Sequence, residues 1–246
     1  MNETPRLFVS VFAYVMGKEV EDLGAAVRDE IEAGAAASWP GFRTLARVRA
    51  QMAPIVLSVN HSSLIAKARS LAMGAFLESG APLWLSIDDD VEAPAEDLAK
   101  LLGPLDVDVL IAPCALRTER GAPAQLNLVA EKGTVLRDLG TRRGVPVRGF
   151  AIESGGLALS VVTRAAAEQL DAAHPELRFL DHGRRGLGAF LEEVREGAWH
   201  GEDFAFCRRA RALGLRIDAL WDTSITHAGV TATVDPRFFV RSDRLD

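Results

Sequence analysis

Short apolar runs alternate with amphipathic segments through the first half of the chain. The apolar runs predict β-strands at residues 7–14, 54–59, 83–87 and 105–113, and the segments between them predict helices at 19–32, 64–77 and 94–102. Strands that alternate with helices are typical of parallel strands joined by crossover helices. We therefore predict an α/β fold with a Rossmann-like, mostly parallel central sheet flanked by helices.

The second half of the chain has a less regular pattern. Short strands are predicted at 215–219 and 223–226, and an amphipathic helix is predicted to begin after Gly201 and to end at Gly214. Residues 171–200 have no sustained periodicity and predict a loop that could act as a lid over a site. No linker-like stretch separates the two halves, so we expect one domain whose irregular second half supplies substrate-facing walls.

Composition and charge exclude several classes of protein. The 246 residues are 48% hydrophobic, enough to fill a substantial core, and the net charge of −6 gives no overall positive field that would attract nucleic acid or anionic lipid. The apolar stretch near the amino terminus is too short for a signal sequence or a membrane span. Cys114 and Cys207 lie in separate apolar runs, which favours reduced, buried thiols over a disulfide or a zinc site. We expect a cytoplasmic protein without stable membrane insertion.

Three consecutive carboxylates follow the predicted strand at 83–87. Ligands of open α/β sheets bind at the carboxyl ends of the strands, where Asp88, Asp89 and Asp90 are expected to lie. If the chain stays extended, Asp88 and Asp90 point to the same side and offer the oxygen ligands that Mg2+ or Mn2+ prefers, while Asp89 faces elsewhere. The alternative interpretation is a solvated acidic turn. Three adjacent negative charges repel one another, which favours a cation at this position.

A second group of polar residues lies near the carboxy terminus. Glu202 and Asp203 open the predicted helix after Gly201, where carboxylates also stabilise a helix through its dipole. At the mouth of a cleft, the carboxylate of Asp203 could instead act as a general base that takes the proton from an attacking hydroxyl. His227 follows the last predicted strand, and it is either a hydrogen-bonded structural residue or a ligand that completes a carboxylate-rich manganese site.

Four segments occur together in a familiar order. They are residues 63–69 with the helix that they open, the strand and Asp-x-Asp motif at 84–90, the Gly-Glu-Asp helix at 201–209, and His-Ala-Gly at 227–229. In this combination the chain resembles the GT-A glycosyltransferases, especially compact bacterial and viral members of that superfamily. The resemblance implies a single GT-A domain over residues 1–246, with a nucleotide-sugar-binding half at 1–115 and an acceptor-side, catalytic half at 116–246.

The resemblance also implies contacts to the nucleotide. In that superfamily the first strand and its adjoining loops hold the base or the ribose, which implies Ser10, Phe12 and Tyr14 in this sequence. Arg69 is implied as a contact to phosphate. Ser70 stands where related sequences tend to have asparagine, so a role that needs the amide is not carried over.

The acidic residues and the histidine receive roles in the same way. The resemblance implies that Asp88 and Asp90 bind the ribose and the diphosphate-bound metal ion, while Asp89 faces the donor sugar. The Glu-Asp pair at 202–203 matches the catalytic pair of the superfamily, with its aspartate as the base of an inverting displacement. His227 matches a histidine that contacts the metal ion or the diphosphate.

Two further features bear on the acceptor. Gly155 and Gly156 fall in the place of a Gly-rich segment near the acceptor, where they either let a sugar approach the backbone or permit a bend. Several arginines either form a basic rim that favours an anionic acceptor or serve only as surface charge. These are Arg142, Arg143, Arg148, Arg184 and Arg185.

These expectations combine into one function. It is the transfer of a sugar from a nucleotide diphosphate sugar, with UDP-sugar preferred, to an acceptor hydroxyl, with Mn2+ or Mg2+ as cofactor and with inversion. A nucleotidyltransferase acting on a sugar phosphate is one alternative, but residues 14–18 match its triphosphate-binding loop poorly. A non-catalytic nucleotide- or sugar-binding module is another. The acceptor is open among a saccharide, a lipid-linked sugar, a protein and a modified nucleobase, and the oligomeric state is open as well.

Overall fold

The computed structural model describes residues 6–13, 40–52, 55–61, 64–114, 126–131, 149–220, 222–227 and 230–233. The helix predicted at 19–32 lies outside the described residues, as do Tyr14, Arg142, Arg143 and Arg148.

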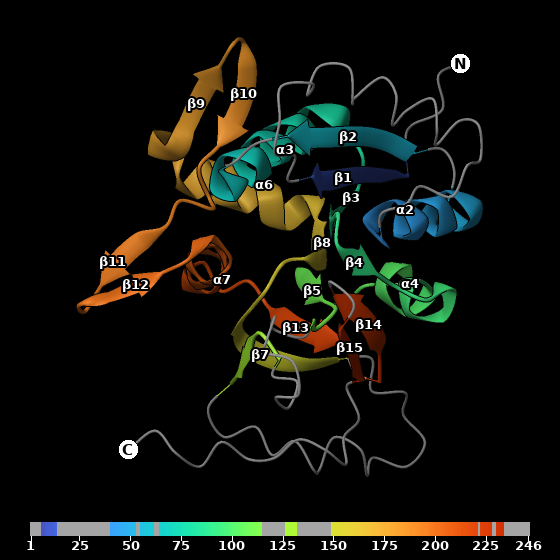
Figure 1. The fold of residues 1–246 in the computed structure, drawn as a ribbon. Helices are drawn as coiled ribbons and strands as arrows, with labels where there is room; N and C mark the ends of the chain where they lie inside the picture. Colours follow the sequence, from blue (N-terminus) through green and yellow to red (C-terminus); the bar gives the residue numbers. More distant parts are fainter. Residues whose placement is uncertain are drawn as a thin grey trace.

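Eight strands form one central sheet in the order β2-β1-β3-β8-β5-β13-β7-β6 (Figure 1). Their bounds are β1 Leu7–Ala13, β2 Ile55–His61, β3 Leu83–Asp88, β5 Val109–Ile111, β6 Leu128–Ala130, β7 Gly149–Gly155, β8 Leu159–Thr163 and β13 Ile217–Leu220. Of the seven neighbouring pairs, β1–β2, β1–β3 and β5–β13 are parallel and the other four are antiparallel.

The α/β fold with a helix-flanked central sheet is confirmed, but the sheet is mixed rather than mostly parallel. Strands β1, β2 and β3 come from the part of the chain in which strands and helices alternate, and they pair in parallel. Strands β6, β7 and β8 come from the part in which this alternation stops. Antiparallel neighbours need no crossover helix between them, so the loss of alternation accounts for the change in pairing.

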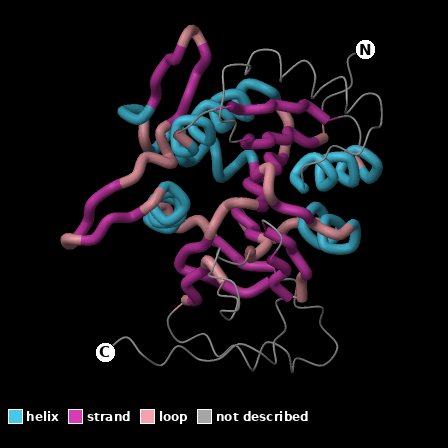
Figure 2. Tube along the Cα trace, in the orientation of Figure 1, coloured by secondary structure: helices cyan, strands magenta, loops and turns pink. Residues whose placement is uncertain are grey.

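Helices cover both faces of the sheet (Figures 1 and 2). The helices α3 (Ile65–Ser79), α6 (Arg164–Ala173) and α7 (Glu202–Ala212) contribute to one core, whereas α2 (Pro40–Gln51) and α4 (Ala95–Leu102) contribute to the other. The predicted end of α7 at Gly214 is confirmed, and α3 ends before Gly80. Both glycines have left-handed φ values, 79° for Gly214 and 73° for Gly80.

Strand β1 shows how one apolar run serves both cores. Phe8 and Phe12 pack into the core under α3, while Leu7, Val9 and Val11 pack into the core under α2 and α4. Successive side chains of a strand point to opposite faces, so a strand covered on both faces is apolar at nearly every position. This is why β1 is a continuous apolar run in the sequence.

The segment at 171–200 was predicted to be a loop, and that prediction is wrong. After a short 3-10 helix at Pro175–Leu177 it forms two hairpins that project from the body of the molecule (Figure 1). The first pairs β9 (Arg178–Asp181) with β10 (Arg184–Leu187), and the second pairs β11 (Glu193–Arg195) with β12 (Ala198–His200). These strands have only three or four residues and carry many charges, so they leave little periodic signal. Residues 40–51, where no helix was predicted, form α2.

A small sheet brings the end of the chain to the acidic triplet. It has the order β15-β14-β4, with β4 at Val91–Glu92, β14 at Ser224–His227 and β15 at Val230–Thr233. In this sheet His227 pairs with Val91, directly after the triplet. As predicted, Cys114 and Cys207 are buried and form no disulfide. Within the part of the chain that the structure describes, no helix is long and apolar enough to cross a membrane.

Candidate active site

The acidic triplet leaves the central sheet in a turn. Strand β3 ends at Asp88, and Asp89 and Asp90 form a turn before β4. The turn is held by its backbone, since the Asp89 N–H donates to the Phe12 carbonyl (2.9 Å) and the Gly41 N–H donates to the Asp89 carbonyl (2.8 Å). The extended chain expected through Asp90 therefore stops at Asp88. Strand alternation therefore no longer relates Asp88 to Asp90, and their carboxylates contact Arg69 and His227, respectively.

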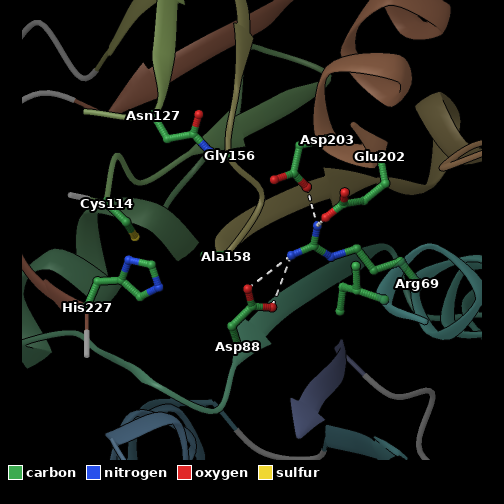
Figure 3. Close-up of a pocket in the computed structure, with 10 residues that line it drawn as sticks. Arg69, Asp88, Cys114, Asn127, Gly156, Ala158, Glu202, Asp203 and His227 are labelled. Atoms are coloured by element: carbon green, nitrogen blue, oxygen red, sulfur yellow. Dashed lines mark hydrogen bonds and ion pairs between the residues drawn. The ribbon is translucent and has the colours of Figure 1, made fainter. Parts of the chain in front are cut away.

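Asp88 belongs to a cluster around one buried guanidinium. Arg69, on α3, is 2% exposed, and its Nη2 donates to both carboxylate oxygens of Asp88 at 3.1 Å. Its Nη1 donates to Glu202 Oε1 at 3.1 Å and also contacts Asp203 Oδ1. Figure 3 shows the guanidinium between Asp88 on one side and the carboxylates at the start of α7 on the other. The Arg69 cluster thus joins the end of β3 to the start of α7.

The Arg69 cluster carries excess negative charge. Three carboxylates (−3) and one guanidinium (+1) sum to −2, and all three carboxylate side chains are at most 23% exposed. Burial raises the pKa of Asp203 to about 6; Arg69 opposes this rise, and Glu202 and Asp88 add to it. Although burial alone would lower it, the pKa of Arg69 is raised by Asp203, Asp88 and Glu202. A cation near these carboxylates would offset their excess charge.

Asp90 and His227 form a separate pair. The His227 Nε2 lies 3.3 Å from Asp90 Oδ2, and the two side chains are 18% and 21% exposed. The pair depends on the small sheet, which fixes β14 against β4. In Figure 3 the His227 imidazole stands across from Arg69, next to Cys114.

A cavity of about 240 Å³ lies between these groups. It is lined by Ile65, Arg69, Asp88, Cys114, Asn127, Gly156, Ala158, Glu202, Asp203 and His227. Five of the residues predicted to be catalytic, to contact phosphate or to bind the metal ion therefore meet at one cavity, although they come from four separate elements. They are Arg69, Asp88, Glu202, Asp203 and His227.

The other candidates take different places. Ser10 is fully buried in the sheet, and its hydroxyl accepts a hydrogen bond from Trp84 Nε1 at 3.1 Å, so its side chain does not reach the cavity. Phe12 is 3% exposed, and its ring centroid lies 5.7 Å from the Arg69 guanidinium carbon. Phe12 therefore packs against the guanidinium of Arg69. Asp89 lies in the turn next to the cavity and Tyr14 lies outside the described residues.

Sequence reasoning missed Asn127 and Cys114. Asn127 lies beside Gly156: its carbonyl accepts the Gly156 N–H at 2.8 Å, and a Cβ at Gly156 would come within 2.5 Å of Asn127 Nδ2. The absent side chain of Gly156 therefore makes room for Asn127. Asn127 had no signal in the sequence, because no motif surrounds it and its contact with Gly156 depends on strand pairing between β6 and β7. Cys114 had been predicted only as a buried thiol.

A second cavity, of about 470 Å³, adjoins the first. Its lining residues are Asn127, Trp199, His200, Gly201, Glu202, Asp203 and Phe204. Asn127, Glu202 and Asp203 line both cavities, so the carboxylates at the start of α7 stand where the two meet. Trp199, on β12, is 67% exposed and offers a large apolar surface at the second cavity.

The fit of these residues to a divalent cation is partial. Among the described residues, no three His, Cys, Asp or Glu side chains are grouped closely enough to hold a metal ion. Asp90 and His227 offer one oxygen and one nitrogen donor at contact distance, and Asp88 lines the same cavity as His227. Carboxylate with imidazole is a donor set that Mn2+ accepts. The chain therefore provides an incomplete ligand set of suitable chemistry.

Comparison with known proteins places the fold. No protein-family model matches the chain, and no curated protein matches it in sequence. The solved structure of GalNAc-T7 with UDP, GalNAc and Mn2+ superposes with a TM-score of 0.52 at 10% identity, covering 92% of this chain and 44% of that one. The chain has a GT-A-like fold.

Two other structures resemble the chain less closely in three dimensions. A197 from STIV has a TM-score of 0.46 at 16% identity and covers 97% of this chain and 96% of its own. The catalytic domain of Drosophila β1,4-galactosyltransferase 7 in complex with xylobiose has a TM-score of 0.42 at 12% identity, covering 97% of this chain and 75% of that one. The assignment of the GT-A-like fold rests on the GalNAc-T7 superposition.

Proposed function

We propose that the protein is a metal-dependent glycosyltransferase that moves a sugar from a nucleotide diphosphate sugar to an acceptor hydroxyl. The observation that carries the proposal is the place of Asp203. This carboxylate lies at the junction of two cavities, one of which also holds Asp88 and His227 while the other holds Trp199. One cavity for a donor and one for an acceptor, with a carboxylate between them, is the arrangement that a displacement reaction needs.

The first cavity is the proposed donor side. UDP is the first nucleotide to test, because GalNAc-T7, whose fold this chain shares, was solved with UDP and Mn2+. Asp90 and His227, with Asp88 across the cavity, would hold a Mn2+ or Mg2+ ion. Such an ion supplies Lewis-acid neutralisation of the diphosphate charge. Asp89 and Tyr14 stay candidates for contacts to the sugar and the base, whereas the buried Ser10 is no longer included.

The second cavity is the proposed acceptor side. Asp203 accepts the proton of the acceptor hydroxyl while the oxygen of that hydroxyl forms a bond to the anomeric carbon of the donor sugar. At the same time the bond from that carbon to the diphosphate oxygen breaks. A single displacement of this kind inverts the anomeric centre. The pKa of Asp203, raised by burial to about 6, suits a group that must take up a proton near neutral pH. Trp199 provides a flat surface on which an acceptor can rest.

Arg69 has a supporting role in this proposal. Its guanidinium is buried and already contacts Asp88, Glu202 and Asp203, so it holds the carboxylates in place. All three partners are carboxylates that share this one guanidinium as their counter-ion. We therefore assign to Arg69 the orientation of Asp88 and Asp203.

Release of nucleotide diphosphate tests the proposal. The wild type would be incubated with Mn2+, a panel of nucleotide sugars and a panel of p-nitrophenyl glycosides as acceptors. Asp203→Asn should lower turnover by roughly 10²- to 10⁴-fold, the usual contribution of a general base, while affinity for the nucleotide is kept.

Asp218→Asn is the matched control. Asp218 is also a buried carboxylate paired with an arginine, Arg216, but it lines neither cavity, so turnover should stay near that of the wild type. Equal turnover in the wild type and Asp203→Asn would remove Asp203 from the reaction. If the wild type binds UDP but consumes none of the sugars, the protein is a binding module instead.

A further inference from the structure

The β11–β12 hairpin forms one wall of the second cavity and continues directly into α7. Trp199 and His200 of β12 line this cavity, and Gly201 is the N-cap residue of α7. The two strands pair with each other and with no other strand in the described part of the chain. An isolated two-stranded hairpin is marginally stable in water. Its position must therefore depend on how its base is fixed.

Glu193, on β11, fixes the base of the hairpin through contacts with arginines of α7. Figure 1 shows the β11–β12 hairpin leading into this helix. The Glu193 carboxylate contacts Nε and Nη2 of Arg208 through both oxygens, and it lies 3.4 Å from Nη2 of Arg209. In the same guanidinium, Nη1 of Arg209 donates to the carbonyls of Ala189 (2.9 Å) and Leu191 (2.7 Å), just before the hairpin. Two neighbouring arginines of α7 thus hold the segment that enters the hairpin.

The same carboxylate is linked to the cavity through strand pairing. Glu193 lies opposite His200 in the hairpin register, so the residue that contacts α7 is also the cross-strand neighbour of a cavity residue. The Glu193 side chain is 21% exposed and does not line either cavity. Glu193 therefore touches nothing at the junction of the cavities and can act there only through the residues that it holds.

The outer part of the hairpin has no comparable support. Val194 and Trp199 are cross-strand partners, and each is 67% exposed. Glu196 and Gly197 form the turn with φ values of 54° and 79°, the backbone of a tight two-residue hairpin loop. The hairpin is therefore held to the body mainly at the end that carries Glu193.

We propose that Glu193 is a positioning residue: its ion pairs with Arg208 and Arg209 hold Trp199 and His200 at a fixed distance from Asp203. This inference rests on the proposed function, in which the second cavity takes the acceptor. The chemical consequence is that Glu193 governs use of the acceptor and leaves the donor side unaffected. Without the Glu193 carboxylate, the wall of the acceptor cavity moves relative to Asp203.

Asp171 offers a matched control within the same chain. Its carboxylate contacts Arg178 at 2.9 Å and Arg185 at 2.7 Å, and it is 16% exposed, so it is also an acid shared by two arginines at the base of a hairpin. The β9–β10 hairpin that it holds lines neither cavity. Asp171→Asn should therefore reproduce the electrostatic loss of Glu193→Gln without its effect on the acceptor.

Hydrogen exchange tests the positioning step without any substrate. Glu193→Gln should speed amide exchange in residues 193–200 while exchange in α7 stays unchanged, and Asp171→Asn should speed exchange only in residues 178–187. Exchange in 193–200 equal to that of the wild type would overturn the proposal. A reversed pair, Glu193→Arg with Arg208→Glu, should restore slow exchange in the hairpin.

Kinetics test the consequence for the reaction, with a p-nitrophenyl glycoside that the wild type glycosylates as the acceptor probe. Glu193→Gln should raise the acceptor KM by roughly tenfold, as loss of a charge-assisted contact predicts, and should leave the donor KM and donor hydrolysis unchanged. A faster-exchanging hairpin with an unchanged acceptor KM would overturn the proposal. If the wild type uses no nucleotide sugar, the proposed function fails, and hydrogen exchange alone decides whether Glu193 positions the hairpin.

Discussion

Two groups of charged side chains have members that line the same cavity, and the groups differ in how their charge is balanced. In the Arg69 cluster, three carboxylates share one buried guanidinium that is 2% exposed. Across the cavity, Asp90 meets His227 at 3.3 Å on a turn and a small sheet. The first group carries its own counter-ion, whereas the second has the donor atoms that a metal ion uses. The protein thus fixes its proposed base internally and leaves its proposed metal side to be completed by ligands.

Removal of the internal counter-ion should have the largest effect on stability. Arg69→Met leaves three buried carboxylates without a cation, and breaking a buried ion pair in this way costs about 3 to 5 kcal/mol of unfolding free energy. Urea denaturation of the metal-free protein measures it. Arg43→Met is the control: Arg43 pairs with Glu92 at 2.6 Å but is 33% exposed, so its loss should cost about 0 to 1 kcal/mol. Similar losses in the two variants would mean that the Arg69 cluster is not preorganised.

Removal of one anion from the Arg69 cluster should raise the unfolding free energy, whereas removal of the arginine lowers it. Burial raises the pKa of Asp203 to about 6, so the protonated form of this carboxyl stabilises the fold and the ionised form destabilises it. The stability that the protonated form contributes is lost as the pH rises through about 6. In metal-free protein at pH 7, Asp203→Asn should therefore be more stable than the wild type by roughly 1 to 3 kcal/mol.

The pH dependence provides the check on that gain. Below the unfolded pKa of about 3.9, Asp203 is protonated in both states, so the unfolding free energies of the wild type and Asp203→Asn should converge. Urea denaturation between about pH 3 and pH 8 measures the difference. A variant that is less stable than the wild type at pH 7 would show that Arg69 outweighs burial.

The Asp90–His227 pair should matter for ligands rather than for the fold. His227→Gln should lower the affinity for Mn2+ in the presence of UDP by roughly tenfold, a loss typical of a weakened metal site. Its metal-free melting temperature should stay close to that of the wild type, because the glutamine amide can still donate a hydrogen bond to Asp90. Isothermal titration with Mn2+ gives the affinity. An unchanged affinity would assign His227 a purely structural role.

The smallest effect is expected beyond the cavity that these two groups share. Trp199 is 67% exposed, so Trp199→Ala should change the unfolding free energy by less than about 0.5 kcal/mol. If an acceptor rests on the indole, loss of the contact should weaken acceptor binding by about 0.5 to 1.5 kcal/mol. The acceptor KM should then rise roughly two- to tenfold. Steady-state kinetics with a p-nitrophenyl glycoside measure it. An unchanged KM would place the acceptor elsewhere.

The sequence predicted those parts of the site that stand at the ends of regular elements. Asp88 follows an apolar strand and Asp203 opens an amphipathic helix, and both kinds of boundary leave a local pattern. The partnership of Arg69 with Asp203 could not be predicted, because it joins residues 134 positions apart through tertiary packing. The turn at Asp89 and Asp90 was missed because the apolar strand before it predicted that the chain stays extended.

The hairpins and the mixed sheet were missed for a related reason. The strand β11 is a three-residue segment with charged ends, and its pairing with β12 depends on two turn residues, Glu196 and Gly197, rather than on apolar alternation. The strand β8 is apolar like a parallel strand, yet it pairs antiparallel with both β3 and β5. Strand direction is a property of the connections, and an apolar run alone does not encode it.

The most direct test of the proposed function is thermal unfolding with nucleotide diphosphates and nucleotide sugars, with and without Mn2+. The variants are Asp90→Ala and, as a control, Asp106→Ala, whose side chain is 81% exposed. Ligands that bind only the folded state raise its midpoint, by about 5 °C or more at a hundred times the dissociation constant. We predict such a shift with one nucleotide, dependent on Mn2+, abolished in Asp90→Ala and kept in Asp106→Ala. No shift with any nucleotide, or an equal shift in Asp90→Ala, would contradict a metal-dependent donor site at the acidic turn.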